Sequence, residues 1–256
     1  MAPVVIVPLI LWFGWRGMFQ ILGIVGLVYV FFYALFVKQT KPQEETEEDK
    51  SKKNKYFLHL LKFSLIWKLI LCAFCISCIN KGLDAWMPTY LIAERGINLK
   101  AVGYLTPIPF IASFLSTAIC GWVMNKYFDK KENWMIVICA AMTAIFLYFM
   151  YNAETIMWVV IFQCGVYFFK ACIMGTAVAI VLKIVTGSIA GCTSTLINMG
   201  GQVAGFISPI IMGYLVYTFN GSFNAVFYYL MGVATLCAIS ALLIPTRKED
   251  MLDLEK

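Results

Sequence analysis

Long apolar stretches place the strongest constraint on how this chain of 256 residues can fold. A helix needs about 20 predominantly apolar residues to cross a bilayer, because each residue adds about 1.5 Å toward a hydrocarbon core of about 30 Å. Seven stretches meet this length: residues 17–37, 66–91, 102–123, 134–151, 156–182, 190–217 and 223–244. The run over residues 2–12 is too short to cross and is expected to be the end of a helix. The sequence therefore predicts an all-α, multi-pass membrane protein.

Composition supports this class and excludes two others. Hydrophobic residues make up 61% of the chain and charged residues 13%, whereas soluble domains carry about 25% charged residues. A water-soluble domain could not bury so much apolar surface, and disorder requires low hydrophobicity. The net charge of +6 comes mostly from Lys and Arg between the apolar runs. That pattern indicates membrane topology and a lipid partner, and we expect no nucleic-acid partner.

The distribution of Lys and Arg predicts the orientation. Alternate polar segments carry fourteen Lys and Arg on one side of the membrane and three on the other. Because cytoplasmic loops carry the excess, the richer side is predicted to be cytoplasmic. It holds a linker over 38–62, a loop over 124–133, Lys183 and a tail over 246–256. Residues 1–37 and a six-helix bundle over 63–245 complete the predicted domain organisation.

Charged residues inside the predicted spans are the first candidates for function, because a charge at the bilayer centre costs at least about 2.5–3.5 kcal/mol. Lys68 is close enough to a span end to reach the interface. Lys81 and Asp84 are three residues apart and are predicted to share a helix face. They form either a stabilising ion pair or a group in which Lys81 contacts an anion and Asp84 accepts a coupled proton. Trp86 and Asn80 lie in the same stretch.

Polar residues on two later spans complete the predicted pathway. Lys170 lies midway along its stretch with no acid there, so it is expected to face a cavity, a lipid headgroup, an anion or Asp84; Gln163 precedes it by seven residues. Asn198 and Gln202 are four residues apart and predict one polar stripe along a helix. The pairs Gly187/Gly191 and Gly201/Gly205 are predicted to let neighbouring helices approach closely.

The sequence gives little support for catalytic or metal chemistry. All nine cysteines lie in apolar runs, and we expect them to be free thiols. Cys72, Cys75 and Cys78 have a C-x-x-C-x-x-C spacing, but no fourth ligand follows. His59 is the single histidine, which excludes H-E-x-x-H, and no phosphate-binding or nucleophile motif occurs. We therefore predict no enzyme, no metal and no cofactor.

Four motifs occur in a fixed order along the apolar stretches. They are FGWRGMF at 13–19, WMPTYL at 86–91 followed by ERG at 94–96, NMGGQVAG at 198–205 followed by Pro209 and Gly213, and GSFN at 221–224. Together they resemble motifs of the anion:cation symporter family within the major facilitator superfamily. GLDAWMP at 82–88 also resembles organophosphate antiporters, whose phosphate-binding arginine would fall at Asn80.

The resemblance implies the C-terminal six-helix half of that fold plus one or two preceding helices. It also implies alternating access, an organic anion such as a sugar acid as substrate, proton symport and a bacterial plasma membrane. A missing N-terminal half is then an expected partner. The substrate-binding residues would be Asn80, Lys81, Trp86, Gln163, Lys170, Asn198 and Gln202, with Asp84 as the proton carrier. The alternative is a non-transporting remnant, or a structural or regulatory membrane partner.

Overall fold

A computed structural model describes residues 2–36, 61–129, 131–184 and 188–244. The predicted tail and all but the last two residues of the predicted linker lie outside these ranges, so both stay predictions. In the described ranges the helices are α1 (Ala2–Phe36), α3 (Ser64–Ala93), α4 (Leu99–Leu105), α5 (Ile108–Tyr127), α6 (Glu132–Tyr151), α7 (Ile156–Ile184), α8 (Ser188–Thr218) and α9 (Asn224–Leu242). Seven segments are long and apolar enough to cross a membrane, with α4 and α5 forming one of them, which confirms the seven predicted spans.

Two predicted boundaries were wrong. The stretch 102–123 is divided between α4 and α5, because Pro107 and Pro109 have no backbone N–H to donate to the preceding helical turn. The predicted loop over 124–133 is also shorter. Helix α5 continues to Tyr127 and α6 begins at Glu132, so the apolar pattern underestimated both helices by two to four residues.

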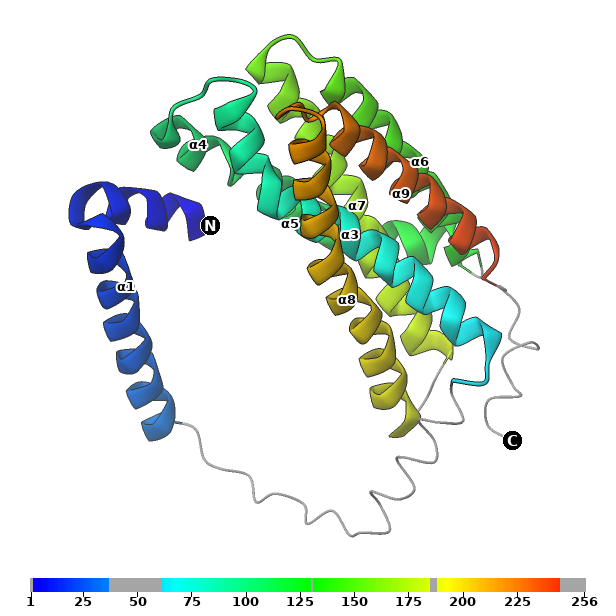
Figure 1. Ribbon diagram of the computed structural model, residues 1–256. Helices are drawn as coiled ribbons and strands as arrows, with labels where there is room; N and C mark the ends of the chain where they lie inside the picture. Colours follow the sequence, from blue (N-terminus) through cyan, green and yellow to red (C-terminus); the bar gives the residue numbers. More distant parts are fainter. Residues whose placement is uncertain (1, 37–60, 130, 185–187, 245–256) are drawn as a thin grey trace.

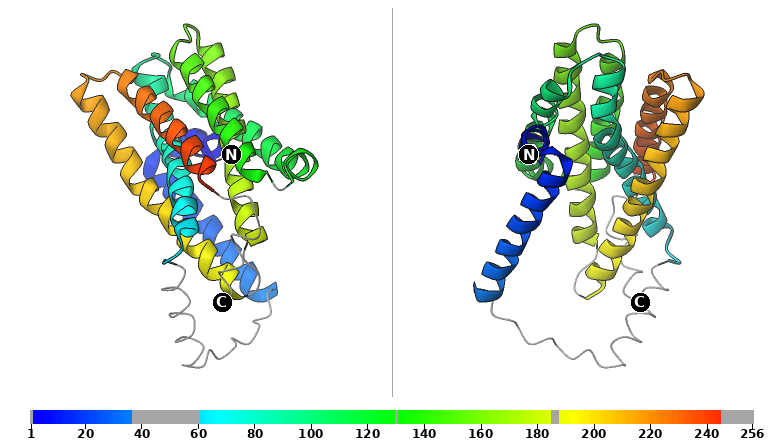
Figure 2. Two further views of the ribbon diagram at one scale, coloured as in Figure 1. Left: turned by 90° about the vertical axis from the view of Figure 1, so that its right-hand side faces the viewer. Right: turned by 60° about the vertical axis from the view of Figure 1, so that its left-hand side comes forward.

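Helix α1 is bent sharply near its start, as Figure 1 shows. The bend lies at Gly14, whose φ of 68° and ψ of 173° are not helical, and glycine adopts positive φ without steric cost. This agrees with the prediction that residues 2–12 and 17–37 belong to separate helices. The long arm of α1 stands apart from the bundle in Figure 1 and in the right-hand view of Figure 2, and the main contacts of α1 are with α4.

The other helices form one bundle in which α3 packs against α7, α8 and α9. Small residues on α8 allow a close approach to α3: a Cβ added to Gly200 would lie 2.8 Å from Ile70 Cγ2, and one added to Gly201 would lie 2.7 Å from Ser77 Oγ. The expected close packing at Gly201 is thus confirmed. Gly191 has no neighbour within 4 Å of its added Cβ, so the same prediction was wrong there.

Arg95 ties the C-terminal end of α3 to the turn between α6 and α7. Its Nε donates to the Tyr90 hydroxyl at 2.8 Å, and its guanidinium nitrogens donate to the carbonyl oxygens of Ala153 at 2.7 Å and Glu154 at 3.4 Å. Hydrogen bonds from a charged donor are among the strong ones in proteins. The end of α3 is therefore held close to the start of α7.

Candidate functional site

A charged polar group joins α3 to α7 inside the bundle. The Tyr167 hydroxyl donates to Asp84 Oδ1 at 2.6 Å, and Lys170 Nζ lies 3.4 Å from the same oxygen. Lys170 is only 3% exposed, whereas the Asp84 side chain is 38% exposed. One side of the ion pair is therefore buried in the bundle while the other remains accessible.

The α7 side of this group is a stripe of three polar residues. Gln163, Tyr167 and Lys170 follow one another at intervals of four and three, so they share a helix face. All three are buried, and Lys170 Nζ lies 3.3 Å from the centroid of the Tyr167 ring. Gln163 Nε2 is buried and has no hydrogen-bond partner in the described part of the chain.

Helix α5 supports the polar stripe of α7 through hydrogen bonds to the α7 backbone. Ser113 Oγ donates to the Tyr167 carbonyl oxygen at 3.0 Å, and Ser116 Oγ donates to the Phe168 carbonyl oxygen at 2.6 Å. The Phe110 ring packs edge-on against the Tyr167 ring with 5.2 Å between centroids. Hydroxyl groups commonly join helices in this way inside membranes. The α7 donors consequently have a rigid support.

The structure identifies Lys170, and not Lys81, as the ionic partner of Asp84. The local ion pair of Lys81 and Asp84, one of the two alternatives for these residues, is therefore not formed, although a spacing of three residues permits it. The physical reason is that the Tyr167 hydroxyl and the buried ammonium of Lys170 together solvate the carboxylate, while Lys81 is exposed. Of the options expected for Lys170, contact with Asp84 is the one observed.

A second polar surface lies between α3 and α8. A Cβ added to Gly205 would be 3.2 Å from Lys81 Cγ, so the stem of Lys81 crosses α8 at this glycine. Gln202 is one turn before Gly205, and Asn198 is one turn earlier again; both side chains are exposed. Asn80 is half-buried on α3 next to Lys81. The predicted polar residues thus belong to three helices: Asn80 and Lys81 to α3, Gln163 and Lys170 to α7, and Asn198 and Gln202 to α8.

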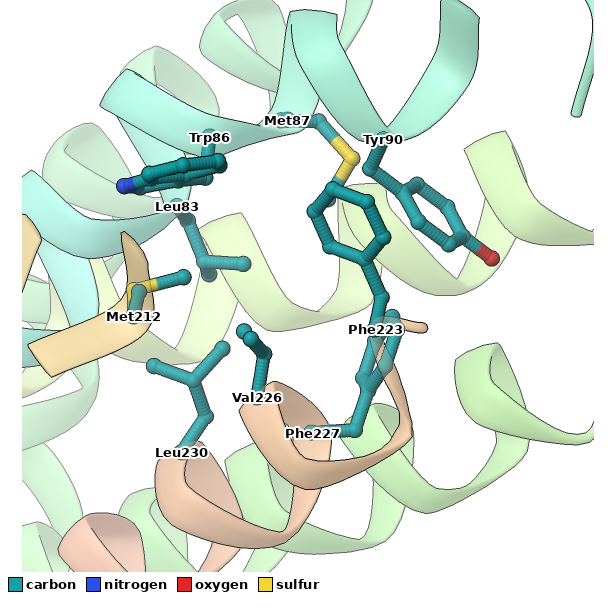
Figure 3. A pocket seen from close by; sticks show the side chains of 9 residues that line it. All are labelled: Leu83, Trp86, Met87, Tyr90, Met212, Phe223, Val226, Phe227 and Leu230. Carbon is teal, nitrogen blue, oxygen red and sulfur yellow. The ribbon is translucent and has the colours of Figure 1, made fainter. Parts of the chain in front are cut away.

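Trp86 has a different position from the other predicted site residues. Its indole N–H donates to the Pro209 carbonyl oxygen at 3.0 Å, and a Cβ added to Gly213 would lie 2.9 Å from its ring. Figure 3 shows Trp86 at the edge of an apolar pocket formed by α3, α8 and the start of α9. The lining residues are Leu83, Trp86, Met87, Tyr90, Met212, Phe223, Val226, Phe227 and Leu230.

That pocket offers a sugar acid almost no hydrogen-bonding group, so the polar residues of α3, α7 and α8 are the better candidate site. A contact between Trp86 and substrate stays a prediction, and the structure gives Trp86 a role in holding α3 against α8. Seven of the eight cysteines whose side chains are described are buried free thiols of the apolar core.

Tyr167 is the site residue that sequence reasoning missed. Tyrosine is common in these apolar stretches, with 13 in the chain, so its identity alone carried no signal. Its position four residues after Gln163 and three before Lys170 was a usable signal, because this spacing aligns all three on one helix face. Arg95 was likewise noted in a motif without its role in fastening α3.

Comparison with protein families gives one matching model. The model described as the Major Facilitator Superfamily matches residues 1–209. This match covers α1, α3 and α7 completely and α8 as far as Pro209, so it includes all the candidate site residues.

Curated relatives with sequence similarity are named as transporters of sugar acids. The Probable galactarate/D-glucarate transporter GudP of Escherichia coli K12 is 26% identical over 179 residues, which cover 67% of this chain and 38% of that protein. The D-galactonate transporter of Escherichia coli O6:H1 is 24% identical over 165 residues, covering 62% of this chain and 37% of that protein. The hexuronate transporter of Bacillus subtilis is 25% identical over 165 residues, covering 61% and 39%. The matched region thus spans less than half the length of these relatives.

A solved structure has a similar fold. It is the bacterial homolog to the human lysosomal transporter Spinster in an inward-facing and unoccupied conformation. The TM-score is 0.62 at 13% sequence identity, and the alignment covers 94% of this chain and 60% of that chain. At this identity the likeness concerns the fold alone, and it agrees with the predicted all-α transporter architecture.

Proposed function

Because the chain belongs to the Major Facilitator Superfamily, we propose that it acts in a secondary transporter that carries a sugar acid or a similar organic anion across a bacterial plasma membrane. The observation that carries this proposal is the contact of Lys170 and Tyr167 with the Asp84 carboxylate. The same two donors suit the carboxylate of a sugar acid. The names of the relatives support this substrate class.

In this proposal the polar residues bind different groups of the substrate. Lys170 and Lys81 supply positive charge to the anion, and the amides of Asn80, Gln163, Asn198 and Gln202 hydrogen-bond its hydroxyl groups. Amide side chains suit polyhydroxy compounds because each offers both donors and acceptors. The apolar surroundings strengthen these interactions, since the effective dielectric constant is lower than in water.

Coupling to protons and alternating access belong to the same proposal. Asp84 is the proposed proton carrier, because its side chain combines access from outside the bundle with an ionic partner on another helix. Two six-helix halves would rock about a midplane site, and the second half would come from outside this sequence. The linker, the 124–133 loop and the C-terminus are proposed to be cytoplasmic.

Uptake assays test the function directly. Cells without sugar-acid transporters of their own would express the complete reading frame that contains this chain and be given radiolabelled D-glucarate, D-galactonate or a hexuronate. We expect saturable uptake of at least one anion that a protonophore abolishes. Lys170→Gln should abolish uptake, whereas Lys100→Gln, at an exposed lysine of α4, should leave it unchanged.

Absence of uptake of all three anions, with the protein present in the membrane, would refute the proposal. It would favour a non-transporting remnant or a structural or regulatory membrane partner. Loss of uptake in Lys100→Gln as well would contradict the assignment of Lys170 to the anion site.

A further inference from the structure

We propose that Asp84 is an internal ligand that occupies the carboxylate-binding position of the transporter until a substrate carboxylate replaces it. This inference rests on the proposed function and adds a mechanism to it. The substrate carboxylate would bind Tyr167 and Lys170 on α7, at the place where Asp84 Oδ1 now lies. Asp84 would then leave as the neutral acid, carrying the transported proton.

The donors form a site that does not depend on Asp84 for its shape. Tyr167 is 2% exposed and Lys170 3% exposed, and the Lys170 ammonium rests on the Tyr167 ring. Both belong to α7, whose backbone at Tyr167 accepts a hydrogen bond from Ser113 of α5. An O–H donor and an ammonium that meet at one oxygen make a strong, charge-assisted site for a carboxylate.

The Asp84 carboxylate is more accessible than the two donors that it contacts. Asp84 belongs to α3, and its side chain is 38% exposed, about ten times the exposed fraction of its partner Lys170. Its two described side-chain contacts are both with α7, and both fall on Oδ1. Asp84 can therefore withdraw from α7 toward the exposed side while the donors stay in place.

Gln163 adds a buried amide next to Tyr167, and its Nε2 makes no hydrogen bond of good geometry in the described ranges. The Gln163 side chain is 1% exposed. Buried donors are rarely left unpaired, because the lost hydration is not replaced. Gln163 is one helical turn from Tyr167 on the same face. A sugar acid bound at Tyr167 and Lys170 would extend one of its hydroxyl groups to this amide.

Charge balance then links the anion to a proton. Two carboxylates cannot share the Lys170 ammonium without strong repulsion, so Asp84 must take up a proton as the substrate arrives. The titratable groups that contact Asp84 are Tyr167 and Lys170 of α7, and Lys81 of α3 acts electrostatically on Lys170. Helix α8 faces this part of α3 with Ser208 and Met212, which carry no charge. The site exchanges one carboxylate for another and gains one proton, which stays on the Asp84 carboxyl group.

Binding of D-glucarate to the purified complete protein tests this mechanism. For the wild type, we expect the affinity to fall as pH rises from about 5 to about 8, by up to tenfold per pH unit once Asp84 is ionised. Asp84→Asn should bind at high pH as tightly as the wild type binds at low pH, without this dependence. It should also lose proton-driven accumulation and keep counterflow. Glu94→Gln, which neutralises an exposed acid at the end of α3, should retain the wild-type profile.

An Asp84→Asn protein that keeps the wild-type pH profile, or that binds D-glucarate more weakly at every pH, would overturn the inference. The proposed function would still stand if the wild type transports the anion. A second measurement avoids the variant altogether. Binding of D-glucarate to the wild type in weakly buffered solution should take up about one proton per anion, and binding without proton uptake would overturn the inference equally.

Discussion

Replacement of Gly200 by alanine should separate two helices that carry the candidate site. The added Cβ would lie 2.8 Å from Ile70 Cγ2 and 3.2 Å from the Ile70 carbonyl oxygen on α3. The methyl group can move by rotation of the side chain, but the carbonyl belongs to the helix backbone. Relief of the contact therefore requires α3 and α8 to move apart.

The magnitude follows from two opposing effects. Extra atoms in a packed interior cost about 1–3 kcal/mol, while alanine favours a helix over glycine by about 1 kcal/mol. Gly232→Ala in α9 is the matched control, because its added Cβ meets nothing within 4 Å. The difference between the variants isolates the clash. With about 2 kcal/mol for the clash and about 2–4 °C per kcal/mol for a chain of this length, Gly200→Ala should melt about 4–8 °C below Gly232→Ala.

The buried thiols provide the assay. A maleimide that fluoresces on reaction would report unfolding in detergent, since seven of the eight described cysteines are buried in the folded chain. Equal melting temperatures for the two variants would refute the argument, because they would mean that α3 and α8 do not approach at Gly200 as closely as described. A lower melting temperature for Gly232→Ala would refute it as well.

Three further expectations concern other parts of the bundle. Arg95→Ala should lower the melting temperature, because it removes hydrogen bonds made by a charged donor, and each such bond contributes about 1.5–3 kcal/mol. Lys100→Ala, at an exposed lysine, is the control. Equal melting temperatures of the two variants would contradict the role of Arg95. In a Cys192→Ser background, a small maleimide should label half-buried Cys164 before buried Cys237. Mass spectrometry of peptides would give the order of labelling, and the reverse order would contradict the burial of these two side chains. The cysteine of Asn152→Cys, in the turn after α6, should react with an impermeant maleimide added outside the cell. Labelling only from the cytoplasmic side would mean that the topology is the reverse of the one proposed.

The sequence was sufficient for the spans because a bilayer demands a fixed length of apolar helix, which composition reveals directly. It also identified Asp84 and Lys170, since intramembrane charges are rare. The sequence alone did not establish that Asp84 and Lys170 form an ion pair. A spacing of three residues is visible in a sequence, but the distance between Asp84 on α3 and Lys170 on α7 depends on how the helices pack. The division between α4 and α5 was missed because prolines near a helix start are compatible with several outcomes.

The hydrogen bonds of Arg95 turn the end of α3 into a pivot. They hold this end beside the start of α7, so α3 and α7 can diverge more easily at residues farther from it. Asp84 is nine residues before Ala93, the last residue of α3, and at 1.5 Å per residue this is an arm of about 14 Å. A tilt of about 4° about the pivot then displaces Asp84 by about 1 Å, enough to part a 3.4 Å contact with Lys170. Small rotations of α3 about this end can thus open the ion pair without any helix unwinding.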